Sequence, residues 1–246
     1  MRLFTNLDEA ASEIKRDIAK SPIVKSSRVQ NILQESQVYE ALDYSYSVIE
    51  MPRTKTEIFD LGIKQQFWKE EDRGMLVPWL DGERAVRLNW QPGTILEKLH
   101  PHLKHLVAPI GSWGKEPEYT YTDRLRDSIP ATATVLINDP SSRRAYWPLF
   151  HVEDAVRATR VVRIPCSTSY HPLIREVNGQ PYLHLTYTER SCDFNKFWLT
   201  DIWLARQWQL ELLYHLKGVP HLKGIQCGNT THFITSFHAF IDDEVY

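Results

Sequence analysis

The sequence predicts an α+β protein built around a large β-sheet. Strand-like runs outnumber helical ones, and only some of the strands alternate with helices along the chain. With 246 residues, of which 42% are hydrophobic and 24% charged, the chain can bury one substantial core. We therefore expect one domain over residues 1–246, with a two-domain organisation as the alternative.

Composition excludes several classes of protein. The net charge of −2 gives no overall attraction to nucleic acid or to an anionic membrane. No apolar stretch approaches the roughly 20 residues that span a bilayer, and the N-terminus resembles a charged helix more than a signal sequence. A cytoplasmic protein without a membrane or nucleic-acid partner is expected. Three cysteines without a CxxC pair argue against a disulfide framework or a thiolate zinc site.

Two elements stand out in the first part of the chain. Asn6 and Glu9 have capping-box spacing, which predicts a helix from about Leu7. Residues 38–50 alternate and are rich in aromatic and β-branched side chains, as in a strand. Residues 56–70 are ambiguous, and we interpret them as a helix.

Residues 74–127 predict no clear element. They include "HPHLKH", in which His100, His102 and His105 suggest a metal site. No acidic or cysteine partner stands at helix spacing from them, so a solvated loop is the better interpretation.

The second half of the chain predicts more elements. "TATVLIND" (132–139) has the composition of a strand and is followed by the turn "DPSS" and a second strand over 143–150. Residues 160–191 predict two strands joined by the turn "VNGQ". Residues 199–216 predict a helix that ends at Gly218, and "KGIQCGNTTHFITSFHAF" predicts a last strand.

Polar side chains gather at the ends of these predicted strands. Cys166 follows a β run and a proline, Arg143 and Arg144 open one strand, and Arg190 closes another. A thiol beside arginines is a candidate nucleophile, whereas an isolated cysteine in a β run is usually a small buried hydrophobe. Sequence spacing alone leaves both interpretations open.

The ordered motifs "DPSSRR", "PC", "RSCD" and "SFHAF" resemble the thymidylate synthase superfamily, which includes the deoxycytidylate and cytidylate 5-hydroxymethylases. The match covers about residues 139–240, while residues 1–138 match only loosely. The resemblance implies a thymidylate synthase-like fold, with a large mixed sheet flanked by helices and a sheet-to-sheet homodimer. It also implies transfer of a one-carbon unit from 5,10-methylenetetrahydrofolate to C5 of a pyrimidine nucleoside monophosphate.

By this resemblance, five residues would hold the 5′-phosphate of the nucleotide. Arg190, Ser191 and Arg28 would bind it within one subunit. Arg143 and Arg144 match a pair that reaches the phosphate across the dimer interface, so two chains would build each site. Arginine suits this role because its planar fork of donors satisfies several phosphate oxygens at once.

The resemblance also assigns the reacting parts of the site. Cys166 would be the nucleophile that adds to C6 of the ring and makes C5 able to attack a one-carbon unit. Asp193 matches the residue that contacts the pterin of the folate, and His238 matches the histidine near the ribose.

Asp201 is the position that would recognise the base. Thymidylate synthases carry an asparagine there, whose amide donates to uracil O4 and accepts from N3–H. Cytosine reverses that edge, and the cytidylate hydroxymethylases resemble this chain in having aspartate. The alternative is that Asp201 only caps the following helix.

Several departures from the family pattern leave alternatives open. Gln65 stands where the family has its catalytic glutamate, and Gln cannot relay a proton as Glu can. Phe240 replaces the tyrosine that pairs with His238, and Phe197 replaces a glycine on the folate side. The sequence also ends six residues after Phe240, where typical members continue into a tail over the folate. The chain is therefore expected to be a one-carbon transferase that hydroxymethylates or methylates a cytidylate, dCMP or CMP, at C5. A thymidylate synthase acting on dUMP and a non-catalytic or redirected nucleotide-binding paralogue are the alternatives.

Overall fold

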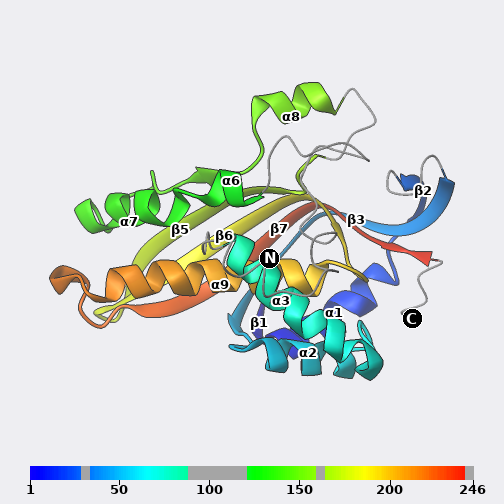
Figure 1. Cartoon of the computed structure of the whole chain (residues 1–246), viewed down its shortest axis with the longest axis horizontal. Coiled ribbons are helices and arrows are strands. Elements are labelled where there is room, and N and C mark those ends of the chain that lie inside the picture. Colours follow the sequence, from blue (N-terminus) through cyan, green and yellow to red (C-terminus); the bar gives the residue numbers. More distant parts are fainter. Residues whose placement is uncertain (29–33, 88–120, 159–163, 242–246) are drawn as a thin grey trace.

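The computed structural model describes residues 1–28, 34–87, 121–158 and 164–241. These residues form one seven-stranded sheet with helices packed on it (Figure 1). The fold is therefore mixed α+β with a large sheet, as the sequence predicts.

The sheet is mixed, with the strand order β1-β3-β7-β6-β5-β4 and β2 paired to β3. The pairs β1–β3 and β6–β7 are parallel, and the other pairs are antiparallel. The strands are β1 (Arg2–Asn6), β2 (Ile23–Arg28), β3 (Gln34–Glu50), β4 (Trp147–Pro148), β5 (Ser167–Val177), β6 (Gln180–Asp193) and β7 (Gln226–Phe240).

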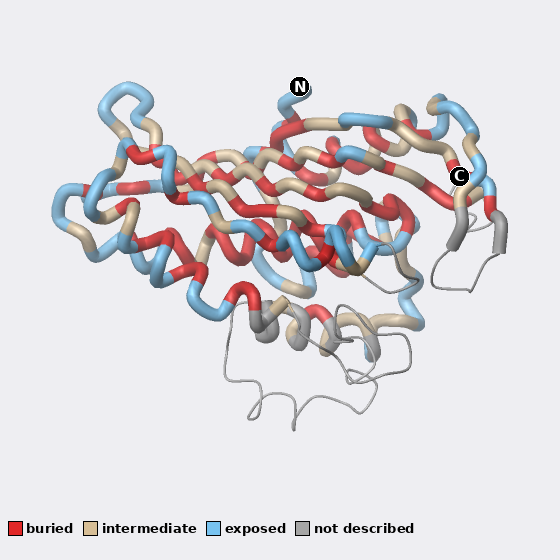
Figure 2. The backbone as a smooth tube through the Cα atoms, turned by 90° about the horizontal axis from the view of Figure 1, so that it is seen from above, coloured by how far each residue is buried: buried red, intermediate tan, exposed pale blue. Residues whose placement is uncertain are grey.

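Helix α9 (Trp198–Lys217) is the central helix of the core. It is buried on nearly every side, and it packs against β6 and β7. Along the strands of the sheet, buried residues alternate with intermediate ones (Figure 2). No helix in the described ranges is long and apolar enough to cross a bilayer. The other helices are α1 (Leu7–Ile18), α2 (Lys55–Lys64), α3 (Arg73–Arg87), α6 (Tyr121–Leu125), α7 (Ser128–Asn138) and α8 (Val152–Arg157), with short 3₁₀ turns at Glu70–Asp72 and Pro220–Leu222.

Several predicted elements are confirmed. The Asn6 side chain accepts a hydrogen bond from the Glu9 amide at 2.9 Å and so begins α1 at Leu7. The predicted strand 38–50 lies within β3, and the predicted helix 199–216 lies within α9, which ends at Gly218. The predicted helix over 56–70 is shorter, because α2 ends at Lys64.

The segment "TATVLIND" is not a strand, and this prediction was wrong. It belongs to α7, in which the Thr134 hydroxyl donates to the Pro130 carbonyl at 2.8 Å and Thr132 donates to Ser128. Through these hydrogen bonds to the carbonyls one turn earlier, the two β-branched threonines are accommodated in a helix. Burial against α9 then outweighs their preference for strands. The predicted strand 143–150 is also reduced, to the two residues of β4.

In β5 and β6 the regular alternation of side chains between the two faces of the sheet is interrupted at the same level. Their register shifts between Ser167 and Ser169, which places an extra residue in β5. In β6 the buried positions alternate up to Glu189 and resume at Cys192. Glu189 and Cys192, three residues apart, consequently point to the same side.

The neighbouring strands β7 and β3 are irregular at the same level. Glu189 pairs with Ile234 of β7, where the buried alternation shifts between Ile234 and Phe237. Opposite this point in β3, Asp43 has a positive φ of 50°. β-Bulges re-aim side chains and are frequent next to active sites. This line of irregularities marks the level of the sheet at which Cys166 and Arg190 lie.

The hairpin turn between β5 and β6 gives a test of backbone strain. Asn178 and Gly179 both have positive φ, of 51° and 77°, as expected for a two-residue turn of the Asn-Gly type. A Cβ on Gly179 would meet no atom within 4 Å, so Gly179→Ala introduces strain without a clash. We expect it to lower the free energy of unfolding by about 1 kcal/mol.

Chemical denaturation of both variants measures this effect. Gly218→Ala is the matched control, because Gly218 also has open space around its Cβ but a negative φ of −79°. Its stability should remain within about 0.5 kcal/mol of the native protein. Equal losses in the two variants would show that backbone strain is not the cause.

Candidate active site

Cys166 and Arg190 meet at the start of β5 and the end of β6. The Cys166 side chain is exposed, and its Sγ lies 3.8 Å from Nη2 of Arg190. The Arg190 guanidinium also donates to the carbonyls of Pro165 (2.7 Å) and Ile164 (3.3 Å), which fixes its position beside the thiol. A cation held against an accessible thiol favours the thiolate, which is the nucleophilic form.

The backbone around Cys166 is held in place from both sides. The Arg190 amide donates to the Cys166 carbonyl at 2.9 Å. From the other side, the Tyr121 hydroxyl of α6 accepts bonds from the amides of Cys166 and Ser167, both at 3.2 Å. Rigid support of this kind keeps a nucleophile in one orientation.

The structure describes the side chains of only some of the arginines that are predicted to bind the phosphate. Arg143 and Arg144 are exposed, in a turn built by Asp139, whose carboxylate accepts from the amide and hydroxyl of Ser141. Arg28 ends β2, but its side chain lies outside the described part of the chain. The three histidines at 100, 102 and 105 also lie outside the described residues.

Ser191 and His238 lie on the paired strands β6 and β7 near this level of the sheet. Both side chains are half-buried. Asp193 is the β6 residue that pairs with His238, whose ring packs edge-on against Phe240 with centroids 5.3 Å apart. Adjacent strands thus bring together residues that the sequence separates by more than 40 positions.

Asp193 is buried at the junction between β6 and α9. One of its carboxylate oxygens accepts from the amides of Asn195 (3.0 Å) and Lys196 (3.3 Å), so it also shapes the turn. Asn195 is 4% exposed, and within the described part of the chain neither the oxygen nor the nitrogen of its side-chain amide has a hydrogen-bond partner. An unpaired buried amide beside a carboxylate is suited to a polar ligand.

Asp201 lies inside α9 and does not cap it. The helix begins at Trp198, its N-cap is Phe197, and the Asp201 amide already donates to the Phe197 carbonyl at 2.8 Å. The alternative interpretation of Asp201 as an N-cap is therefore wrong. Its side chain is 9% exposed, and its carboxylate lies within 4.8 Å of both Glu189 and the thiol of Cys192.

A buried chain of hydrogen bonds reaches this acidic group from β3 and β7. Trp198 Nε1 donates to the Tyr46 hydroxyl (2.7 Å), which bonds Nδ1 of His232 (2.9 Å). Nε2 of His232 bonds Oε2 of Glu189 at 2.9 Å, and neither of these two side chains is more than 1% exposed. Burial raises the pKa of Tyr46, so its hydroxyl keeps its proton.

Gln65 is tied to α1. Its side-chain nitrogen donates to the Asp8 carboxylate (2.6 Å) and to the Ser12 hydroxyl (3.1 Å). The hydrogen bond from Lys64, together with the one from Gln65, lowers the pKa of the Asp8 carboxyl group. Nearby, Trp68 stacks on Phe59 with centroids 5.7 Å apart. The described contacts of Gln65 are thus structural, and none of them joins it to Cys166.

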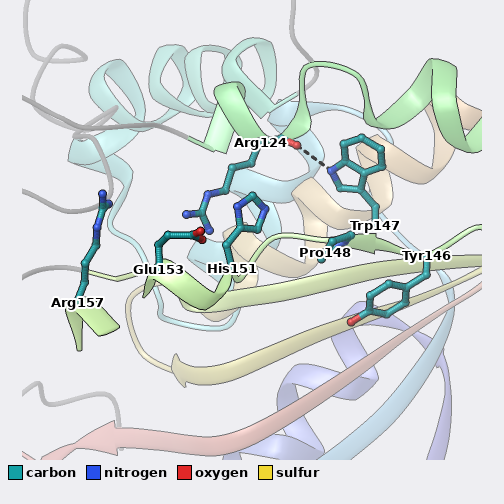
Figure 3. Close-up of a pocket in the computed structure, with 7 residues that line it drawn as sticks. All are labelled: Arg124, Tyr146, Trp147, Pro148, His151, Glu153 and Arg157. Carbon is teal, nitrogen blue, oxygen red and sulfur yellow. Dashed lines mark hydrogen bonds between the residues drawn. The ribbon is translucent and has the colours of Figure 1, made fainter. Parts of the chain in front are cut away.

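A cavity of about 560 Å³ lies beside β4 and α8 (Figure 3). Its lining contains Arg124, but that guanidinium is already bound to the buried carboxylate of Asp154, with Nη2 and Oδ1 2.9 Å apart. Among the described residues, the lining consists of Arg124, Tyr146, Trp147, Pro148, His151, Glu153 and Arg157, none of which belongs to the predicted site.

No protein-family model and no curated protein matches the sequence. Among solved structures, the chain is similar to the thermostable thymidylate synthase A from Bacillus subtilis. The TM-score is 0.54 and the sequence identity 14%, over 96% of this chain and 80% of that chain. The chain has a thymidylate synthase-like fold, as its motifs predict, and identity this low establishes the fold alone.

Sequence reasoning missed three residues around the site. Tyr121 falls in a segment for which no element was predicted, and Glu189 and His232 look like ordinary members of strands. One signal was present for Glu189, a charged side chain in a position where β6 alternates toward the core. A buried charge requires a partner, so it points to a polar cluster.

Proposed function

We propose that the chain is a pyrimidine nucleotide C5 one-carbon transferase that acts on a cytidylate, dCMP or CMP. The observation that carries this proposal is the exposed thiol of Cys166, held 3.8 Å from the Arg190 guanidinium. Isolated cysteines in strands are usually buried and inert, whereas this one is accessible and lies beside a cation.

In this proposal, the Cys166 thiolate adds to C6 of the pyrimidine. The bond from sulfur to carbon forms as the C5–C6 π electrons move, and C5 becomes nucleophilic. Arg190, with Ser191, Arg28 and the Arg143–Arg144 pair, binds the 5′-phosphate and positions C6 over the sulfur. His238 contacts the ribose.

The co-substrate would be 5,10-methylenetetrahydrofolate, which supplies a one-carbon unit at the oxidation level of formaldehyde. The chain offers two groups that fit a pterin ring, the carboxylate of Asp193 and the unpaired buried amide of Asn195. Together they present both donors and acceptors to an aromatic heterocycle. These residues would hold the ring beside the nucleotide.

Base recognition is assigned to Asp201. The residue is buried inside the first turn of α9, where capping does not account for it. A carboxyl oxygen at the ring edge accepts from the N4 amine of cytosine and opposes the O4 of uracil. A thymidylate synthase acting on dUMP is the alternative that this residue disfavours.

A non-catalytic nucleotide-binding protein is the second candidate, and the contacts of Gln65 favour it. An amide bound to Asp8 and Ser12 does not perform the proton transfers that a glutamate would. Under this alternative the chain would bind a nucleotide without activating C5.

Exchange of the C5 hydrogen separates these candidates. Incubation of dCMP carrying tritium at C5 with the protein should release tritium to water, because addition at C6 makes that hydrogen exchangeable. Binding of dCMP without any tritium release would favour the non-catalytic alternative. Faster release from dUMP than from dCMP would favour the thymidylate synthase alternative.

We also propose that the active protein is a homodimer in which Arg143 and Arg144 complete the partner's site. Both side chains are exposed at a turn, as expected of groups that reach outward. Sedimentation at micromolar concentration should therefore give a dimer. A monomer with full exchange activity would rule this arrangement out.

Mixed dimers test the shared site more directly. Cys166→Ala and the double variant Arg143→Ala/Arg144→Ala should each have little exchange activity alone. When the two are mixed and allowed to exchange subunits, one site of each hybrid has all of its native residues, and activity should return. If no activity returns in confirmed hybrids, both functions must reside in one chain.

A further inference from the structure

We propose that His171 is a positioning residue that holds the Arg143–Arg144 pair in place for the partner's nucleotide site. This inference rests on the proposed function, in which the pair binds the 5′-phosphate across a homodimer. Its structural basis is a hydrogen bond between His171, on β5, and the turn that carries the two arginines. Nε2 of the His171 ring lies 3.2 Å from the backbone carbonyl oxygen of Arg143.

The direction of this hydrogen bond follows from the chemistry of its two ends. A carbonyl oxygen can only accept, so Nε2 of His171 carries a proton and donates it. The neutral ring with its proton on Nε2 and the protonated ring both meet this requirement, so the contact does not depend on the charge of His171. The ring of Tyr146 packs edge-on against the imidazole, with centroids 5.6 Å apart and an angle of 73° between the planes, which limits rotation of the imidazole.

The turn from Asp139 to Tyr146 has internal hydrogen bonds of its own. The amide of Ser142 donates to the Asp139 carbonyl (3.0 Å), and the amide of Arg144 donates to the Ser142 hydroxyl (3.2 Å). At the end of the turn, the amide of Tyr146 donates to the Arg144 carbonyl (2.8 Å). These bonds shape the turn but do not attach it to the sheet. Backbone pairing with β5 begins only at Trp147 of β4.

His171 attaches the turn to the sheet before that point. Its hydrogen bond fixes the carbonyl of Arg143, while the Tyr146 amide fixes the carbonyl of Arg144. Both arginine side chains are exposed. In the described ranges, no carboxylate or carbonyl group binds either guanidinium, so the backbone sets the region that each one reaches. Anchoring that backbone lowers the entropy that is lost when the pair closes on a phosphate group.

Replacement of His171 by alanine should weaken the use of dCMP and leave the chemical step unchanged. Loss of one hydrogen bond that positions the pair should raise the KM for dCMP about five- to tenfold in the tritium-release assay. The kcat should stay within about twofold, because the arginines contact the phosphate and not the reacting carbons. His171→Gln keeps a side-chain N–H donor and should restore the native KM. An unchanged KM in His171→Ala overturns the inference.

His221→Ala is the matched control. Nε2 of His221 bonds the backbone carbonyl of Ile137 at 2.9 Å, which is the same kind of contact made to α7 instead of to the arginine turn. Its KM should equal that of the native protein, and a rise as large as that of His171→Ala overturns the inference. Tyr146→Ala removes the ring that packs on His171 and should raise the KM in the same way, so the test stands even if His171→Ala does not fold.

Mixed dimers show whose site His171 serves. In a hybrid with Cys166→Ala, the His171→Ala chain keeps its own nucleophile and receives a native arginine pair from its partner, so tritium release at low dCMP concentration should return. In a hybrid with Arg143→Ala/Arg144→Ala, neither site receives a properly held pair, and release should stay low. If His171 instead supports the site of its own chain, the two hybrids exchange these results, and that pattern overturns the inference.

The proposed function fails separately from this inference. If hybrids of Cys166→Ala with the double arginine variant regain no activity, the shared site does not exist and both proposals fail. If those hybrids are active but His171→Ala has the native KM, or is restored by the double arginine variant and not by Cys166→Ala, the shared site stands and the role of His171 does not.

Discussion

Replacement of Cys166 by alanine should abolish exchange of the C5 hydrogen of dCMP while sparing nucleotide binding. In the proposed mechanism the Cys166 thiolate forms the bond to C6, and no other described thiol is exposed to replace it. Loss of a nucleophile typically costs on the order of 10⁴-fold or more in rate. The affinity for dCMP should stay within about threefold, because the substitution leaves all of the proposed phosphate-binding residues in place.

Cys227→Ala is the matched control for this experiment. Cys227 lies on β7, and burial raises the pKa of its thiol, so it is not a reactive nucleophile. Tritium release by this variant should equal that of the native protein. If Cys166→Ala retains release at the native rate, the covalent mechanism is wrong.

Replacement of Asp201 by asparagine should move the base preference from cytidylate towards uridylate. In the native protein, uracil O4 would face an acceptor oxygen inside a buried site and remain unpaired. Such a mismatch costs about 1–3 kcal/mol, or roughly ten- to a hundredfold in affinity. The asparagine amide restores a donor for O4, so dUMP should bind more tightly and dCMP more weakly.

Calorimetric titration of dCMP and dUMP against both proteins measures this preference. Asp193→Asn is a useful comparison, because Asp193 is also buried in this region but shapes the turn before α9. It should leave the ratio of the two affinities unchanged. Equal affinities for dCMP and dUMP in native protein and in Asp201→Asn would show that Asp201 does not contact the base edge.

Most of the central sheet could be predicted because its signals are local. Alternation predicts β3, and the Asn178–Gly179 turn predicts the β5–β6 hairpin. Helix α7 could not be predicted in this way. Its β-branched residues, which are threonine, valine and isoleucine, favour strands locally. Packing against α9 overrides that preference.

The parts of the candidate site that belong to sequence motifs could be predicted. The contacts that depend on the register between strands could not. The motifs predict that Cys166 and Arg190 belong to one site, and in the structure their side chains are in contact. The pairing of Glu189 with His232 depends on the parallel register of β6 and β7 and on the irregularity that turns Glu189 and Cys192 to one side. A residue-by-residue pattern does not contain that register.

Product analysis tests the central claim most directly. The native protein is incubated with dCMP and 5,10-methylenetetrahydrofolate, and the nucleotide is then examined by mass spectrometry and fragmentation. We predict a product enlarged at C5 by a hydroxymethyl or methyl group, formed from dCMP in preference to dUMP and absent with Cys166→Ala. Recovery of both nucleotides unchanged, under conditions in which dCMP demonstrably binds, would contradict the proposed transferase activity.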